Sequence, residues 1–300
     1  MTYSIAARDE RTGRFGVAVQ SHWFAAGALV PWAQPGVGAV ATQATVEVGY
    51  GPRGLELMAA GKDAGSSLEA LLAQDDDADV RQVAMVDARG HVATHTGDDC
   101  IKMAGHRRGP GYSVQANMML RDSVPRVMAE AYESSDGDLA DRLLGALDAA
   151  EAASGDIRGR QAAGLLVVAA EPSDEPWNDV VVHLRVDDHP EPLVELRRLF
   201  TRRSAYERME EAERLELAGD PEGALHAQEV ALAAYPDDPE FAFWTAISRA
   251  RAGRVQDAVS TIGVAYGASD GWPELLRRLS ADRQVELEDD VVAALLSADP

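Results

Sequence analysis

The β-prone runs of this sequence end at about residue 200, and the remaining hundred residues have only a helical pattern. Before that point, short apolar runs recur between glycine-containing turns, which is typical of strands. A chain of 300 residues also exceeds the usual size of one domain, roughly 100 to 200 residues. The change in pattern therefore predicts two domains, residues 1–200 and residues 201–300.

Hairpins are predicted at two places in the first part. Runs at 2–7 and 14–20 flank a polar loop that ends in Gly13, and 80–97 alternates on both sides of a turn at 88–90. The run at 36–43 is small and apolar on both parities, as expected of a strand buried on both faces. Further strands are predicted at 112–116, 164–169 and 180–186.

Helices in the first part come in groups. Apolar residues at helical spacing predict two helices within 53–72 and two within 118–153. A doubly wound parallel sheet would instead alternate single strands with single helices. The grouping favours an α+β domain in which stacked antiparallel sheets are covered by helices.

A 34-residue repeat organises the second part. Gly219 and Gly253, Ala224 and Ala258, and Ala231 and Ala265 are each separated by that distance. This is the tetratricopeptide period, and small residues at such positions let paired helices approach closely. Because two repeats are few for an independent solenoid, we expect the module to pack on the first domain or on a second subunit, as in a homo-oligomer.

The charge of the chain limits its partners. A formal charge of -22 repels phosphate backbones and anionic lipids, so we expect neither nucleic acid nor membrane as a partner. No apolar run approaches the ~20 residues that cross a bilayer. The first residues, MTYSIAARDE, lack the pattern of a secretory signal, so we expect a cytoplasmic protein.

Motifs for cofactors and metals are missing from the sequence. No GxGxxG follows a predicted strand, no GxxxxGK[ST] occurs, and the seven histidines show no HExxH spacing. The single cysteine, Cys100, lies beside two aspartates that disfavour a thiolate, so we interpret it as an inert thiol. We expect no cofactor and no metal.

Thr2 is the most suggestive single residue. Methionine aminopeptidase generally removes Met1 when a small residue follows, and removal here would expose a threonine with a free α-amine. An amine with a pKa near ~8 can accept the hydroxyl proton directly or through one water. One residue would then supply both nucleophile and base; the alternative is that Thr2 is simply the start of a strand.

The order of elements resembles that of the N-terminal-nucleophile hydrolases, in which two antiparallel sheets lie between layers of helices. Residues 20–27 are similar to a proteasome-type segment in which an acidic residue and a serine precede a turn of small residues. Ser21 stands where the acid would be, and no lysine precedes Lys62. The proteasome arrangement of threonine, aspartate and lysine is therefore not predicted.

A closer resemblance is to a prokaryotic family known as domain of unknown function 1028, which is assigned to the same superfamily. Seven stretches between residue 2 and about residue 200 carry it: TYSIAARD (2–9), GVAVQS (16–21), GVGAVATQA (36–44), YGPRGLELM (50–58), SVQANM (113–118), GDIRGRQAA (155–163) and LRVDDHPEPL (184–193). The resemblance implies a four-layer αββα sandwich and supplies no reaction. Members can also carry a C-terminal region described as peptidoglycan-binding, which residues 201–300 resemble; docking of a protein is an equal alternative.

Other polar residues in these stretches complete the candidate site. Asn117, at the end of a β run, can donate to a developing oxyanion, or it can satisfy a turn. Gln43 can orient substrate or water, or it can be a core hydrogen-bonding residue. Ser21 is preferred over His22 as a third catalytic residue, because neighbours on a strand point to opposite faces.

The loop at 155–161 packs charge, amide and glycine together before a strand. Its side chains can bind a substrate carboxylate, or they can form a self-contained salt-bridged turn. The candidate substrate-binding residues here are Asp156, Arg158, Arg160 and Gln161.

Three hypotheses follow from the sequence. The first is an amide-bond hydrolase of a small molecule or small peptide, in which Thr2 attacks the carbonyl and Asn117 helps to hold the oxyanion. The second is an inactive N-terminal-nucleophile fold that serves as a scaffold, with the helical repeats as the binding surface. The third is a binder of cell-wall glycan, which would need an export route.

Overall fold

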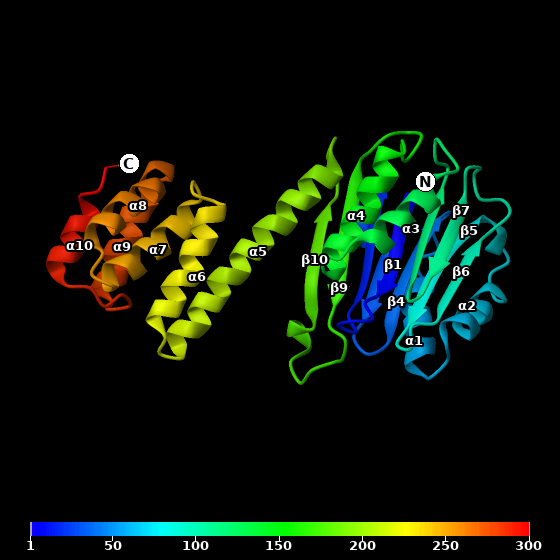
Figure 1. The fold of residues 1–300 in the computed structure, drawn as a ribbon, viewed down its shortest axis with the longest axis horizontal. Helices are drawn as coiled ribbons and strands as arrows, with labels where there is room; N and C mark the ends of the chain where they lie inside the picture. Colours follow the sequence, from blue (N-terminus) through cyan, green and yellow to red (C-terminus); the bar gives the residue numbers. More distant parts are fainter. Residues whose placement is uncertain (1, 300) are drawn as a thin grey trace. The chain divides into compact units, whose positions relative to one another are not determined.

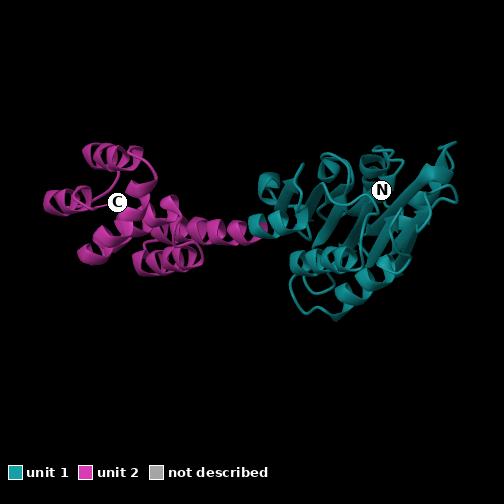
Figure 2. Ribbon diagram, turned by 90° about the horizontal axis from the view of Figure 1, so that it is seen from above, with its two compact units in different colours: residues 1–199 teal, residues 200–300 magenta. Residues whose placement is uncertain are grey.

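The structure, a computed structural model, describes residues 2–299. It divides into two compact units, residues 1–199 and residues 200–300 (Figure 2). The division falls within one helix, α5 (Pro192–Leu217). Each unit has its own buried core.

A six-stranded antiparallel sheet has β1 near its middle. Its order is β10-β9-β2-β1-β8-β7. The strands are β1 (Thr2–Arg8), β2 (Phe15–Ser21), β7 (Gly105–Gly109), β8 (Tyr112–Asn117), β9 (Ala162–Val168) and β10 (Val180–Val186). β1 and β2 are buried along almost their whole length because small and apolar residues occupy both of their faces.

A second sheet faces the first. Its order is β3-β4-β5-β6, also antiparallel, from β3 (Pro31–Gln34), β4 (Gly38–Ala44), β5 (Arg81–Asp87) and β6 (Val92–Thr96). The two sheets contact each other through β1, β4, β5 and β8. Helices α3 (Val124–Ser134) and α4 (Leu139–Ala152) cover the six-stranded sheet, and α1 (Tyr50–Ala59) and α2 (Ala64–Leu72) cover the other (Figure 1).

The prediction of a mixed α+β protein with antiparallel sheets and a helical C-terminal region is confirmed. Two strands were not predicted. β3 is four residues long and starts with Pro31, and β7 has the sequence GHRRG and lies at the edge of its sheet. Neither has the apolar periodicity that predicts a strand.

The second unit consists of helices. After α5 come α6 (Pro221–Ala234), α7 (Pro239–Arg251), α8 (Val255–Ala268), α9 (Gly271–Ala281) and α10 (Asp289–Leu296). The 34-residue spacing extends to the elements themselves, because α6 and α8 begin and end 34 residues apart. The repeated alanines, such as Ala224 and Ala258, are fully buried, and Gly219 and Gly253 both have positive φ at helix ends. In the described part of the chain, no helix combines the length and apolarity needed to cross a bilayer.

Candidate functional site

Thr2 is the first residue of β1, and its side chain lies between the two sheets. Its backbone is paired in register with that of Asn117 on β8. The Thr2 hydroxyl donates a hydrogen bond of 3.0 Å to the Oγ of Ser21, the last residue of β2. The structure thus brings together the three residues that were predicted to be catalytic. The predicted loss of Met1 concerns a residue outside the described range.

Two buried amide side chains donate to the Thr2 carbonyl, and a third, Gln82, accepts from both of them. Gln43 Nε2 donates to the Thr2 oxygen at 3.1 Å and to Gln82 Oε1 at 2.7 Å. Asn117 Nδ2 donates to the same two oxygens, at 3.5 Å and 3.0 Å respectively. The amides of Gln43 and Asn117 therefore fix the backbone of Thr2 and share Gln82 Oε1 as an acceptor.

Gln82, on β5, is the hub of this network and was missed in the sequence. Its Nε2 lies within 2.9–3.1 Å of three acceptors: the Thr96 hydroxyl and the backbone oxygens of Gly105 and Ala116. The signal that could have revealed it is parity. Alternate residues of a strand share a face, and Gln82 shares its face with the buried Ala84 and Val86.

The interface between the sheets is polar at the Thr2 end and apolar at the other. Its apolar end contains Ala6, Phe15, Val17, Ala39, Ala41, Ala84 and Val86. Its polar end adds Ser4 and Gln115 to the network, with Ser4 donating to Gln43 Oε1 at 2.6 Å. Burying polar groups is costly unless each is hydrogen-bonded, so such a cluster is expected where function demands it.

The loops at the Thr2 end form what we call the rim, residues 22–25, 101–103, 118–120 and 155–158. Backbone hydrogen bonds tie the last three of these loops to one another: Met118 to Ile101, Met119 to Met103, and Leu120 to Gly155. The first loop joins them through the His22 N–H, which donates to the Asp156 side chain. The rim exposes large apolar side chains whose exposed fractions are 49–63%: Trp23, Phe24, Ile101, Met103, Leu120 and Ile157. Exposed apolar surface of this kind marks binding sites.

Backbone strain is concentrated at the same end of the unit. Non-glycine residues with positive φ in this unit are Ala25, Ala44, Met103, Met118 and Ser154. Ala25, Met103 and Met118 lie in the rim, Ser154 directly precedes it, and Ala44 ends β4 next to Gln43. A left-handed conformation costs about 1 kcal/mol or more at a residue with a Cβ atom. The concentration of such residues at one end of the unit supports a functional site there.

Asp156 and Arg158 form a salt-bridged turn within the rim. The Asp156 side chain is fully buried, and the Arg158 guanidinium contacts it with Nη2 to Oδ2 at 3.1 Å. Asp156 also accepts from the backbone N–H of Arg158 at 2.9 Å and of His22 at 3.1 Å. The pair therefore anchors the loop that follows Ser21, and the Arg158 side chain remains about one third exposed.

Arg160 and Gln161 lie away from Thr2. Arg160 pairs with Glu151 on α4 at 2.6 Å, and Glu151 also accepts from the Tyr3 hydroxyl at 2.6 Å. Burial raises the pKa of Tyr3, and the neighbouring Glu151 raises it further. Because Tyr3 points to the opposite face of β1 from Thr2, Arg160 belongs to the helix-covered face. Gln161 donates to Asp188 at 3.2 Å, outside the rim.

Cys100 lies beside the rim in a buried position. Its thiol contacts the Arg81 backbone oxygen at 3.3 Å, and burial raises its pKa, so the reactive thiolate is disfavoured. Among residues 2–299, no three His, Cys, Asp or Glu side chains are grouped so that they could hold a metal ion.

Comparison with known proteins locates the first unit within a family. A family model described as "Family of unknown function (DUF1028)" matches residues 2–196. A crystal structure of protein SPO2555 from Silicibacter pomeroyi, with the same family model, is 30% identical, with a TM-score of 0.60 and coverage of 66% of this chain and 87% of that one. Anbu (ancestral beta-subunit) from Yersinia bercovieri is 12% identical, with a TM-score of 0.32 and coverage of 66% and 92%. No curated protein matches the chain.

Proposed function

Since the chain belongs to the DUF1028 family, whose function is unknown, we propose from its site that it is an amide-bond hydrolase in which Thr2 is the nucleophile. The observation that carries the proposal is the position of the Thr2 hydroxyl. It lies at the head of a central strand and is held by Ser21, and the backbone of the same residue is held by a network of buried amides. Removal of Met1 would complete the site by creating a free α-amine on the same residue.

The layering of the first unit supports an N-terminal-nucleophile-hydrolase fold. We interpret the two facing sheets, each covered by two helices, as the four-layer αββα sandwich of that superfamily. In that fold the nucleophile is the first residue of a strand, as Thr2 is the first residue of β1 here. The helical unit, with its 34-residue offset between α6 and α8, we interpret as tetratricopeptide-like.

The reaction can be written so that every proton is placed. The Thr2 oxygen attacks the substrate carbonyl carbon while the α-amine takes the hydroxyl proton. The C–N bond then breaks, the amine passes that proton to the leaving nitrogen, and an ester to Thr2 remains. Water attacks the ester while the amine takes its proton; the ester C–O bond then breaks, the acid leaves, and the amine returns that proton to the Thr2 oxygen.

The neighbouring residues have distinct roles in this proposal. Ser21 fixes the rotamer of the Thr2 hydroxyl, and Gln43 fixes the backbone that carries it. Asn117 is the proposed oxyanion donor. Its 3.5 Å contact with the Thr2 carbonyl is its longer hydrogen bond, so that N–H is the one that can turn to a substrate oxygen.

The rim supports an amide substrate with an apolar portion. Trp23, Phe24 and Leu120 are each more than half exposed, and they lie on loops that follow the strands of Ser21 and Asn117. Burying an apolar group against such side chains contributes about 25 cal/mol per Å². Arg158, beside the buried Asp156, and Lys102 are cationic side chains of the rim.

The decisive experiment combines mass spectrometry with a matched pair of variants. Untagged protein is analysed for retention of Met1 and then incubated with p-nitroanilides of apolar acyl groups. We expect a free Thr2, an acyl adduct on the Thr2 peptide, and turnover that Thr2→Ser preserves in part and Thr2→Ala abolishes. Ser66→Ala, in the exposed first turn of α2, is the control and should match the wild type.

Retention of Met1 in all molecules would remove the proposed base and favour a catalytically inactive scaffold. The same conclusion would follow if Thr2→Ala hydrolysed the anilides as fast as the wild type.

A further inference from the structure

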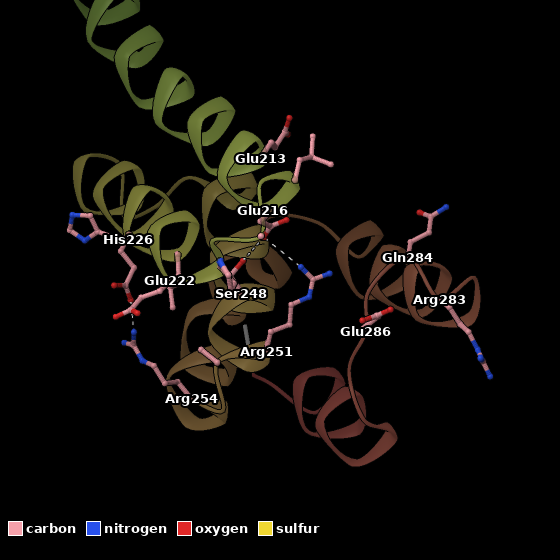
Figure 3. A pocket seen from close by; sticks show the side chains of 16 residues that line it. Glu213, Glu216, Glu222, His226, Ser248, Arg251, Arg254, Arg283, Gln284 and Glu286 are labelled. Carbon is pink, nitrogen blue, oxygen red and sulfur yellow. Dashed lines mark hydrogen bonds and ion pairs between the residues drawn. The ribbon is translucent and has the colours of Figure 1, made fainter.

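The helical unit contains a large groove that does not depend on the chemistry of Thr2. It has a volume of about 1280 Å³ and is lined by α5, α6, α7 and the segment after α9 (Figure 3). Leu217, at the end of α5, lines it with 91% of its surface exposed. A concave, apolar-edged surface of this size is large enough to hold several residues of a peptide.

Carboxylates dominate the charge of the groove. Two of its glutamates are paired: Glu216 with Arg251 at 3.5 Å, and Glu229 with Arg254 at 2.9 Å. Glu213, Glu222 and Glu286 also line it and are exposed, and their carboxylates form no hydrogen bond or ion pair with another described residue. The remaining arginine, Arg283, extends away from the other labelled side chains in Figure 3. The groove therefore presents unpaired negative charge to a ligand.

A smaller cavity of about 240 Å³ adjoins the groove and shares five lining residues with it: Glu213, Glu216, Ser248, Arg251 and Gln284. Its walls include the apolar side chains of Met209, Trp244 and Leu279.

Gln228, on α6, also lines this smaller cavity and is only 6% exposed. Its Oε1 is buried and has no hydrogen-bond partner among the described residues. A buried oxygen without a donor is unfavourable, and an N–H or O–H group placed in this cavity would relieve that cost.

We propose that the groove binds a peptide segment of a partner protein through a lysine or arginine side chain. The methylene stem of that side chain fits between Met209, Trp244 and Leu279, and its N–H groups donate to Gln228 Oε1. Glu213 at the mouth of the cavity neutralises the charge, and the rest of the peptide follows the groove past Glu222 and Glu286. Long cationic side chains combine an apolar stem with a donating head, which matches this lining.

The test is peptide binding to the full-length protein. The probes are fluorescein-labelled pentapeptides with lysine, arginine or acetyl-lysine between alanines, and binding is followed by anisotropy. We expect the lysine and arginine peptides to bind about tenfold more tightly than the acetyl-lysine peptide, because a charged donor strengthens the hydrogen bond to a buried acceptor. Gln228→Leu, which keeps the volume and removes the acceptor, should weaken binding by about the same factor.

Two further variants separate a specific site from general attraction to an acidic protein. Glu213→Gln/Glu286→Gln removes two groove charges and should weaken binding, while Glu207→Gln/Glu210→Gln removes the same charge elsewhere on α5 and should not. Equal loss in both pairs, or equal affinity for the acetyl-lysine peptide, would overturn the proposal. Tighter binding of spermidine than of the peptides would overturn the peptide as the occupant. Circular dichroism and melting confirm that each variant is folded.

Discussion

The sharpest test of the amide network is a comparison of two identical substitutions, Gln82→Leu and Gln20→Leu. Both glutamines are fully buried in the first unit. Gln82 accepts from Gln43 and Asn117 and has three acceptors within reach of its own Nε2. Neither Nε2 nor Oε1 of Gln20 has a partner among the described residues. The two glutamines are therefore equally buried, and they differ in whether their side chains are hydrogen-bonded.

The expected magnitudes follow from counting orphaned groups. Leucine at position 82 leaves one N–H of Gln43 and one of Asn117 without an acceptor, at about 1–3 kcal/mol each, so the loss of stability is about 2–6 kcal/mol. Leucine at position 20 removes an unsatisfied polar group and orphans nothing. The Gln20→Leu variant is therefore expected within about 1 kcal/mol of the wild type, or more stable.

Urea denaturation gives the unfolding free energy of each variant, and hydrogen exchange read by mass spectrometry assigns it to the correct unit. In Gln82→Leu, amides of β1, β4 and β8 should exchange faster, while those of α6 to α8 should be unchanged. If the two variants lost equal stability, buried hydrogen bonding would not be what distinguishes these sites, and the argument for the network would fail.

Three other predictions concern the rim, the acid stability and the helical repeat. Asp156→Asn should lower stability by about 1–3 kcal/mol in urea denaturation, with faster exchange in 155–159, because Arg158 loses its charge partner. Hydrogen bonds from Arg81 are the main cause that lowers the pKa of Asp75 to about 2, below its ordinary 3.8. This contribution is present above the unfolded-state pKa and is lost as pH falls through about 2, so Asp75→Asn should flatten the decline of melting temperature between about pH 4 and pH 2. Ala258→Leu should destabilise the helical unit by about 1–3 kcal/mol through overpacking, measured by thermal melting, whereas exposed Val264→Leu should not.

Much of the fold could be predicted because its central strands carry a strong pattern. Strands such as β4, small and apolar on both parities, can only lie inside a protein, and the alternation of β5 and β6 on either side of a turn predicts their hairpin, although β5 is buried on both faces. Edge strands lack this constraint. β7 has one neighbour and three exposed residues, so its sequence GHRRG gives no periodicity.

The candidate site was predicted only in part. Thr2 and Ser21 stand at the ends of adjacent strands, so a hairpin prediction already places them side by side. Gln82 was overlooked because an amide within an alternating run resembles a solvent-facing residue. Arg158 and Arg160 were predicted to bind substrate together because they share a loop. In the structure, Arg158 contacts Asp156 in the rim, whereas Arg160 contacts Glu151 on the helix-covered face.

The concentration of unfavourable features at one end of the sheets is the strongest reason to place function there. Five non-glycine residues with positive φ together cost several kcal/mol, and six large apolar side chains remain in water beside them. A unit selected for stability alone would have no such asymmetry, since the opposite end of the same interface is filled by alanine and valine.

Both candidate functions, hydrolase and scaffold, use an exposed rim. Only a hydrolase also requires the Thr2 hydroxyl to be held at a fixed point by Ser21, with its backbone fixed by Gln43. The buried amides thus favour chemistry at Thr2 over binding alone, and the state of its α-amine decides between the two.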